Sequence, residues 1–185
     1  MAVIRVSGYP GSGKTTACVK LAEQLKYEYF YAGKILRDLA MQQHLAIEEF
    51  YALLIGDPTL EKSVDKHQEE LMATHGNLIV EGRIAPFLPC PFQTINILLT
   101  VDPRVGAKRQ HERPENSDFT LTEVETRTRE RLANEREHYQ SLYGIDDHFD
   151  AGNFQIVIDT STKTPEEVLV EILSQLKERF EIIPQ

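Results

Sequence analysis

The segment Gly8-Tyr9-Pro10-Gly11-Ser12-Gly13-Lys14-Thr15 constrains this chain of 185 residues more than any other part of its sequence. It fits the pattern G-x-x-x-x-G-K-[ST], with a short apolar run at 2–7 before it and a helix-like pattern at 14–26 after it. The glycines allow successive backbone N–H groups to turn inward around phosphate oxygens, and the N-terminus of the following helix adds partial positive charge. The segment therefore predicts a phosphate-binding loop between a buried strand and a helix.

Two side chains of this loop have expected roles. Lys14 would reach the β- and γ-phosphates of a nucleoside triphosphate, and the hydroxyl of Thr15 would bind Mg²⁺. The alternative is a glycine-rich turn followed by a chance Lys-Thr pair. Both the position of the segment and its flanking elements favour the phosphate-binding loop.

Short apolar runs alternate with helix-like patterns along the whole chain. Strands are expected at 2–7, 27–31, 77–80, 95–101 and 154–158. This alternation predicts an α/β fold, a P-loop NTPase three-layer sandwich whose five-stranded parallel sheet is covered on both faces. The helical segments at about 33–75 and 104–143 are longer than simple crossovers require, so we expect them to cover a site at the carboxyl ends of the strands.

The composition argues against several classes of protein. With 20 basic and 29 acidic residues the net charge is −9, which is unlike a general binder of nucleic acid or of anionic membranes. No apolar run has the length of a membrane span, and the N-terminus does not read as a signal peptide. Cys18 and Cys90 have no Cys or His at metal-ligand spacing, and two cysteines suit a reducing cytosol. We therefore expect a single cytoplasmic domain, 1–185, that binds neither nucleic acid nor membrane.

Two carboxylates follow apolar runs. Glu81 ends one of them, where P-loop proteins commonly place an acid near the metal, and we expect it to hold Mg²⁺ through water because this ion keeps several waters. Asp102 ends another, but Pro103 follows it, which indicates the N-cap of a helix. Arg83 comes two residues after Glu81 and could clamp an anion bidentately, with a surface ion pair to Glu81 as the alternative.

Seven of the eleven arginines lie between Arg104 and Arg136, interleaved with acids. About half of them are expected to form i,i+4 charge pairs on solvated helices. The others suit a reaction that brings two phosphate-bearing substrates together, because cations must then spread across both. His111, His138 and His148 lie in polar stretches and are expected at the solvated surface.

Six segments keep their order across essentially the whole chain and together resemble the nucleoside monophosphate kinases, most closely the short archaeal-type cytidylate kinases. They read GYPGSGKTT, AGKILRDLA, NLIVEGR, VDPRVGAKR, YGID and STKTPEEV. The resemblance implies a core of residues 1–32, 76–109 and 144–185, a monophosphate-binding insertion at about 33–75, and a lid at about 110–143. It also implies ATP as co-substrate, Mg²⁺ as cofactor and CMP or dCMP as acceptor. We expect the protein to act as a monomer.

The same resemblance implies roles for individual residues. Arg37 and Arg83 match arginines that hold the acceptor phosphate, and Arg131 resembles a lid arginine that reaches the transferring phosphates. Glu135 matches an acidic position on the acceptor side, and Arg109 resembles an arginine near the adenine of ATP. Lys14, Arg83 and Arg131 are thereby the expected catalytic residues. The ATP phosphates are expected to lie against Gly8, Tyr9, Pro10, Gly11, Ser12, Gly13, Lys14, Thr15 and Thr16.

Two stretches depart from the family pattern, and both border the expected place of the acceptor base. The chain has Tyr31-Ala32-Gly33-Lys34 where Ser-Ala-Gly-Asp is usual, and IAPFLPCPF follows EGR in place of a small, often Trp-containing stretch. Kinases of AMP, dTMP or a non-nucleotide metabolite therefore remain alternatives. A GTP-binding switch would need Asn-Lys-x-Asp, which the chain lacks. A silent nucleotide-binding module is disfavoured by Lys14, Arg83 and the lid arginines.

Overall fold

A computed structural model describes residues 2–31, 33, 36, 40–45, 50 and 58–183, apart from the side chains of residues 58, 60, 61 and 63. Arg37 and much of the expected insertion at 33–75 lie outside the described residues. None of the helices in these ranges is long and apolar enough to cross a membrane.

The centre of the molecule is a parallel sheet, as the alternating pattern predicts. Its strands are β1 (Ala2–Gly8), β2 (Glu28–Tyr31), β3 (Leu78–Glu81), β4 (Gln93–Thr100) and β5 (Ile156–Asp159). Within the described residues the sheet has five strands in the order β2-β3-β1-β4-β5, and every neighbouring pair is parallel. The carboxyl ends of all strands therefore meet at one edge.

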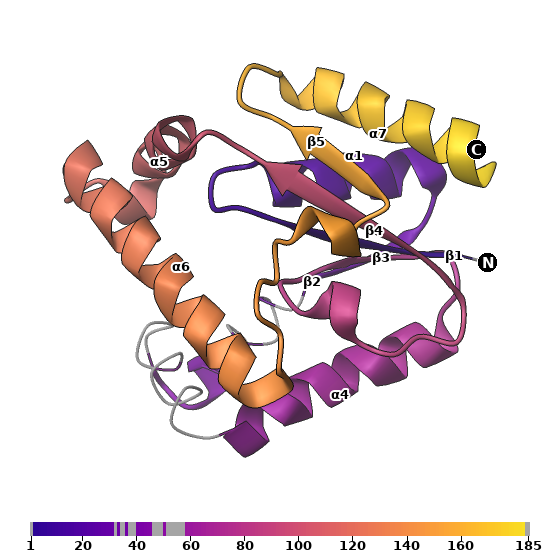
Figure 1. The fold of residues 1–185 in the computed structure, drawn as a ribbon, viewed down its shortest axis with the longest axis horizontal. Coiled ribbons are helices and arrows are strands. Elements are labelled where there is room, and N and C mark those ends of the chain that lie inside the picture. The colour runs from indigo at the N-terminus through magenta and orange to yellow at the C-terminus, as the bar shows by residue number, and fades with distance from the viewer. Residues whose placement is uncertain are drawn as a thin grey trace.

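Helices cover both faces of this sheet, which confirms the predicted three-layer sandwich. They are α1 (Lys14–Leu25), α4 (Pro58–Thr74), α5 (Pro103–His111), α6 (Leu121–Tyr143) and α7 (Pro165–Phe180). Figure 1 shows α1 and α7 on one side of the sheet and α4 on the other, while α6 runs from α5 down to α4.

Two apolar clusters hold these layers together, because successive side chains of a strand point to opposite faces. Ile4 and Val6 of β1 belong to the cluster that packs against α1 and α7. Val3, on the other face, belongs to a cluster with Met72 of α4 and with Ile84, just after β3.

Side-chain caps begin the helices that follow the strand ends. The carboxylate of Asp102 accepts hydrogen bonds from the backbone N–H groups of Arg104 and Val105, which confirms its structural role. Thr120 with Glu123 and Thr164 with Glu167 form capping boxes at the starts of α6 and α7. These caps satisfy N–H groups that have no partner inside the helix.

Candidate active site

The loop after β1 has the backbone of a phosphate-binding loop. Gly11 and Gly13 lie in the left-handed region, with φ of +77° and +81°, and α1 begins at Lys14. A Cβ at Gly11 would come within 2.2 Å of the carbonyl oxygen of Gly106 in α5. Glycine is therefore required at this position both by conformation and by the close approach of α5.

The side chain of Lys14 folds back over this loop. Its Nζ donates hydrogen bonds to the carbonyl oxygens of Gly8, at 2.8 Å, and Tyr9, at 3.0 Å. Burial of the ammonium, followed by the nearby charge of Arg83, lowers the pKa of Lys14 to about 7. Neutral carbonyl oxygens stabilise a buried ammonium group less than negatively charged phosphate oxygens do. Lys14 is therefore well placed to give up these two hydrogen bonds when phosphate binds.

Thr15, in the first turn of α1, meets Glu81 at the end of β3. The hydroxyl of Thr15 donates to one carboxylate oxygen of Glu81 at 2.9 Å, and the hydroxyl of Tyr29 donates to the other at 2.5 Å. Glu81 is buried, and burial together with this hydrogen bond raises the pKa of Tyr29. A hydroxyl beside a carboxylate is a set of hard oxygen donors, which fits Mg²⁺.

Arg83 lies between the loop and helix α6. Its Nη1 donates to the carbonyl of Gly8, the same oxygen that Lys14 contacts. Its Nε lies 3.0 Å from the carboxylate of Glu135, so it pairs with an acid of α6 and not with Glu81, the alternative raised by the sequence. Its guanidinium carbon also lies 5.1 Å from the centre of the Phe149 ring.

Glu135 joins two arginines. One carboxylate oxygen of Glu135 pairs with Arg83, and the other lies 2.8 Å from Nε of Arg131. Burial alone would raise the pKa of Glu135, but the charges of Arg83 and Arg131 outweigh burial and lower it below its usual range. The carboxylate therefore remains ionised and balances both guanidinium groups.

The expectation that His148 lies at the surface is wrong. Only 2% of the residue is exposed, and its Nε2 lies 3.8 Å from Glu135. Neither ring nitrogen has a hydrogen-bond partner within the part of the chain that the structure describes. Burial, followed by the charge of Arg83, lowers the pKa of His148 to about 4, so the ring is neutral near pH 7.

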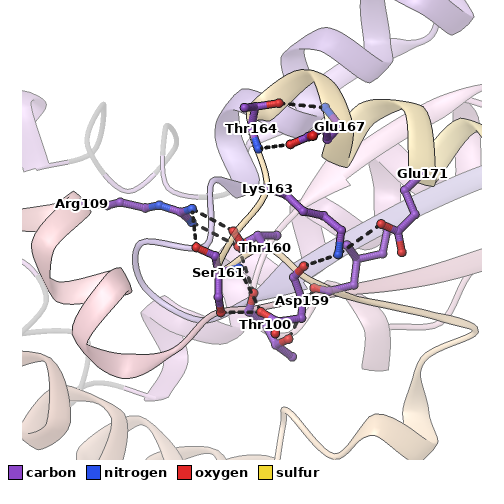
Figure 2. A network of polar contacts seen from close by, with 10 residues as sticks. Thr100, Arg109, Asp159, Thr160, Ser161, Lys163, Thr164, Glu167 and Glu171 are labelled. Carbon is purple, nitrogen blue, oxygen red and sulfur yellow. Dashed lines mark hydrogen bonds and ion pairs between the residues drawn. The ribbon is translucent and has the colours of Figure 1, made fainter.

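Arg109 connects two loops at the edge of the site (Figure 2). From α5 its guanidinium donates to the carbonyls of Thr160, at 2.8 Å, and Ser161, at 3.4 Å, in the loop after β5. It also donates to the carbonyl of Gly11 in the phosphate-binding loop at 3.3 Å. The role near adenine stays a prediction, but these contacts already link the two loops that would flank a nucleotide.

Three other arginines of the cluster have surface contacts. Exposed Arg104 lies 3.8 Å from Glu125, and exposed Arg113 lies 4.0 Å from Glu115. Arg127 stacks on the ring of Phe119. Such exposed pairs contribute little to stability. Neither has the i,i+4 spacing that the sequence analysis expects, which among the arginine pairs described above belongs to Arg131 and Glu135.

The structure thus brings together, at one edge of the sheet, most of the residues that the sequence singles out. They are Gly8, Lys14, Thr15, Glu81, Arg83, Arg131 and Glu135. Tyr9 stacks on Phe149, Ser12 is buried, and Thr16 is exposed. Arg37 lies outside the described residues. Sequence reasoning missed Tyr29, for which the only signal is its position in the strand beside β3.

Comparison with known proteins adds relatives to this geometry. Residues 4–137 match the family model described as AAA domain. The chain is 36% identical over 166 residues to a cytidylate kinase of Pyrococcus furiosus, which covers 90% of this chain and 83% of the relative. It is 33% identical over 179 residues to a cytidylate kinase of Pyrococcus abyssi, covering 97% and 96% of the two chains. A cytidylate kinase of Pyrobaculum neutrophilum is 38% identical over 161 residues, covering 87% and 85%.

Solved structures share the fold at low sequence identity. A shikimate kinase from Bacteroides thetaiotaomicron has a TM-score of 0.64 and 17% identity over 97% of this chain and 98% of its own. A gluconokinase from Sinorhizobium meliloti has a TM-score of 0.61 and 15% identity over 97% and 94%. These likenesses support the α/β architecture and carry no information about the acceptor.

Proposed function

Because the chain belongs to the cytidylate kinase family, and with it to the AAA domain family, we propose that it transfers the γ-phosphate of ATP to CMP or dCMP. It is a nucleoside monophosphate kinase, as its relatives over most of the chain are.

One observation supports the reaction above all others: Lys14 and Arg83 donate to the same carbonyl oxygen, that of Gly8. Lys14 belongs to the loop that would hold the ATP phosphates, and Arg83 follows the strand that would face the acceptor. A donor phosphate and an acceptor phosphate bound to these two cations would lie side by side, as transfer between them requires.

On the ATP side, we assign the phosphates to backbone N–H groups of the loop at 8–16, in which only Pro10 has none, and to the ammonium of Lys14. Contact with phosphate would keep Lys14 charged, since an adjacent anion favours the protonated form. Arg109, which ties Gly11 to the loop after β5, would hold the adenine end of the site in place.

On the acceptor side, Arg83 and Arg37 would hold the monophosphate. An oxygen of that phosphate forms a bond to the γ-phosphorus as the bond from this phosphorus to the β,γ-bridging oxygen breaks, which leaves ADP and a nucleoside diphosphate. Arg131 would stabilise the charge that spreads over the transferring group, and Glu135 would orient both Arg83 and Arg131.

The residues present fit Mg²⁺ as the cofactor. Thr15 would contribute its hydroxyl, and Glu81 would accept from a water of the ion, with Tyr29 holding the carboxylate in place. The ion, when bound, supplies positive charge to the oxygens of the β- and γ-phosphates. Within the described residues no group of three or more His, Cys, Asp or Glu side chains could hold a metal. Mg²⁺ in such sites is held by few protein ligands together with phosphate and water.

The segments at about 33–75 and 110–143 would serve as monophosphate-binding insertion and lid, and the protein would act as a cytoplasmic monomer. In this arrangement the lid arginines reach the phosphates only when both substrates are bound. Water is then excluded from the transferring group, which limits hydrolysis of ATP.

The test is release of ADP from ATP with each of CMP, dCMP, UMP, AMP and dTMP in turn. We expect CMP or dCMP to have the highest kcat/KM and UMP to be a weaker acceptor. A site built to hydrogen-bond one base edge rejects analogues that leave its polar groups unpaired. A higher kcat/KM for AMP or dTMP would contradict the proposal, and activity with none of the five would indicate a non-nucleotide acceptor.

A further inference from the structure

Helix α4 buries polar side chains on the face that packs against the rest of the molecule. Val64, Gln68 and Met72 follow one another at four-residue spacing on that face, and Asp65 lies beside them. Only 3% of Gln68 and 7% of Asp65 is exposed. A helix that merely packed against the sheet would carry apolar residues at these positions, because burying polar groups is unfavourable unless they are paired.

The two polar side chains bind each other in one defined orientation. Nε2 of Gln68 donates to one oxygen of the Asp65 carboxylate at 3.0 Å, and the hydroxyl of Tyr143 donates to the other oxygen. Rotating the amide of Gln68 by half a turn would bring its oxygen against the carboxylate, where two acceptors repel each other. The pair with Asp65 therefore fixes which end of the Gln68 amide remains available.

The available end is a hydrogen-bond acceptor without a donor. Oε1 of Gln68 is buried and receives no hydrogen bond within the described part of the chain. Buried polar atoms are normally paired, so an unpaired one calls for a ligand or another explanation. A ligand group that donates a hydrogen bond, such as an amino group, would give Oε1 of Gln68 the partner that it lacks.

Packed side chains connect this pair with Arg83, which would hold the acceptor phosphate. Ile84, directly after Arg83, belongs to the same apolar cluster as Tyr143 and Phe30. The ring of Tyr139 is 6.3 Å from that of Tyr143 on one side and 4.9 Å from that of His148, the neighbour of Glu135, on the other. Aromatic and aliphatic side chains thus connect the pair with the phosphate end of the site, and such surroundings suit a flat base.

We propose that Gln68 reads the acceptor base by accepting a hydrogen bond from its exocyclic amino group, and that Asp65 is the positioning residue that orients the amide. The inference rests on the proposed function and adds the residues that choose the base. Cytosine presents an amino group at C4, whereas uracil and thymine present a carbonyl oxygen there. An oriented Oε1 therefore favours CMP over UMP and dTMP.

The sharpest test makes two changes separately. One removes the amino group from the substrate, and the other removes the amide of Gln68 from the protein. The substrate pair is CMP and the ribonucleoside 5′-monophosphate of pyrimidin-2-one, which is CMP without its amino group. We expect kcat/KM of the wild type to be at least ~10-fold lower for the analogue than for CMP. In Gln68→Leu, the kcat/KM values for the two substrates should be almost equal. A fall of the same size in both proteins would overturn the inference.

Asp65→Asn tests the orientation. An asparagine can accept from or donate to the Gln68 amide, so both orientations of that amide become possible. The kcat/KM for UMP should therefore rise, and the ratio of kcat/KM for CMP to that for UMP should fall. The matched control is Gln140→Leu, which removes a glutamine that donates to Asp146 on the exposed side of α6. It should keep the wild-type preference, and all variants should keep the wild-type KM for ATP.

The outcomes separate this inference from the proposed function. If the wild type prefers CMP and both Gln68→Leu and Asp65→Asn keep that preference while folded, only the role of this pair is wrong. If the wild type prefers UMP or dTMP, both are wrong. Should Gln68→Leu not fold, Asp65→Asn replaces it in the test. Equal kcat/KM values of the wild type for CMP and its analogue, or an unchanged preference for CMP over UMP in Asp65→Asn, would each overturn the inference.

Discussion

Nε of Arg83 lies 3.0 Å from a carboxylate oxygen of Glu135, and only 15% of each side chain is exposed. The other oxygen of Glu135 pairs with Arg131 at 2.8 Å. One shielded carboxylate thus balances two arginines that would both face phosphate in the proposed reaction. A phosphate that enters the site competes with Glu135 for the same guanidinium groups, since both anions bind arginine by charge-assisted hydrogen bonds.

Glu135→Gln should therefore destabilise the nucleotide-free protein. Removing one partner of a buried ion pair leaves uncompensated charge and typically costs about 3–5 kcal/mol, here toward the lower end because the side chains are not fully buried. Urea unfolding measures the loss. Added CMP should recover more stability in Glu135→Gln than in the wild type, because its phosphate, which Arg83 would hold, replaces the missing anion.

The control for this prediction is Glu125→Gln, which breaks the exposed pair with Arg104. Its effect should stay below about 1 kcal/mol. An unfolding free energy of Glu135→Gln equal to that of the wild type would show that Arg83 and Arg131 do not depend on this carboxylate.

The sequence predicts the frame of this site because local rules decide it. The phosphate-binding loop depends on glycines two or three residues apart in the chain, and the caps at Asp102, Thr120 and Thr164 involve neighbours two or three residues away. The loop backbone and the cap at Asp102 are confirmed. The parallel sheet is confirmed for a similar reason, since apolar runs separated by helices leave few other arrangements.

Contacts between distant segments could not be predicted in the same way. His148 stands in a polar stretch, yet the fold buries it beside Glu135. Tyr29 reads as a strand residue, and its hydrogen bond to Glu81 depends on the pairing of β2 with β3. Asp65 and Gln68 read as ordinary polar helix residues until α4 is placed against the sheet. Pairings of this kind follow from tertiary packing, which periodicity does not encode.

Binding of ATP should be coupled to uptake of a proton by Lys14. The pKa of Lys14 is about 7 in the empty site, so at pH 8 most molecules carry a neutral amine. Phosphates raise this pKa, because an adjacent anion favours the charged form. We expect uptake of close to one proton per ATP at pH 8 and less at pH 6, where the lysine is already charged. Titration calorimetry in two buffers of different ionisation enthalpy measures it.

Lys14→Ala is the control, because it should abolish this uptake while the protein remains folded. The same variant should lose phosphoryl transfer by a factor that corresponds to about 3–4 kcal/mol, the usual effect of removing one stabilising contact to the reacting group. Unchanged proton uptake in Lys14→Ala would assign the proton to another group.

His148 should make stability depend on pH in the acidic range. Burial lowers its pKa from 6.5 to about 4, so the unfolded chain binds a proton near pH 6.5 while the folded protein does not. Stability is therefore complete above pH 6.5 and is lost as the pH falls from 6.5 to 4, by up to about 3 kcal/mol. Urea unfolding at pH 5 and pH 7 measures this slope. His148→Gln should flatten it, and an equal slope in both proteins would exclude His148 as its source.

Arg83→Ala should weaken the acceptor far more than ATP. The guanidinium would make a charge-assisted contact to the acceptor phosphate, whereas its contact with the phosphate-binding loop is to the carbonyl of Gly8. We expect KM for CMP to rise at least ~10-fold and the dissociation constant of ATP to change less than ~3-fold. Arg179→Ala, on the distant helix α7, should leave both unchanged. Equal losses for the two substrates would place Arg83 on the ATP side.

The last prediction concerns Arg131, which lies on α6 and is half-exposed beside Glu135. Neighbouring cations gain little from approaching one another until phosphate lies between them, so we expect its contact with the transferring group to form only when both substrates are bound. Arg131→Ala should then lower kcat by more than ~100-fold and change KM for ATP only slightly, because the lost contact belongs to the reacting complex. The matched control is Arg127→Ala, one turn earlier on α6, whose guanidinium stacks on Phe119.

The same reasoning predicts how the wild type handles ATP alone. Without an acceptor, Arg131 is not drawn onto the phosphates and water is not excluded, so ATP should be hydrolysed slowly. Adding CMP should raise the release of ADP by orders of magnitude, and Arg131→Ala should remove most of that increase while leaving the slow hydrolysis unchanged. Steady-state release of ADP with and without acceptor measures both quantities. Equally fast release with and without every acceptor would identify an ATPase, and Arg131 would then act on water in place of a second phosphate.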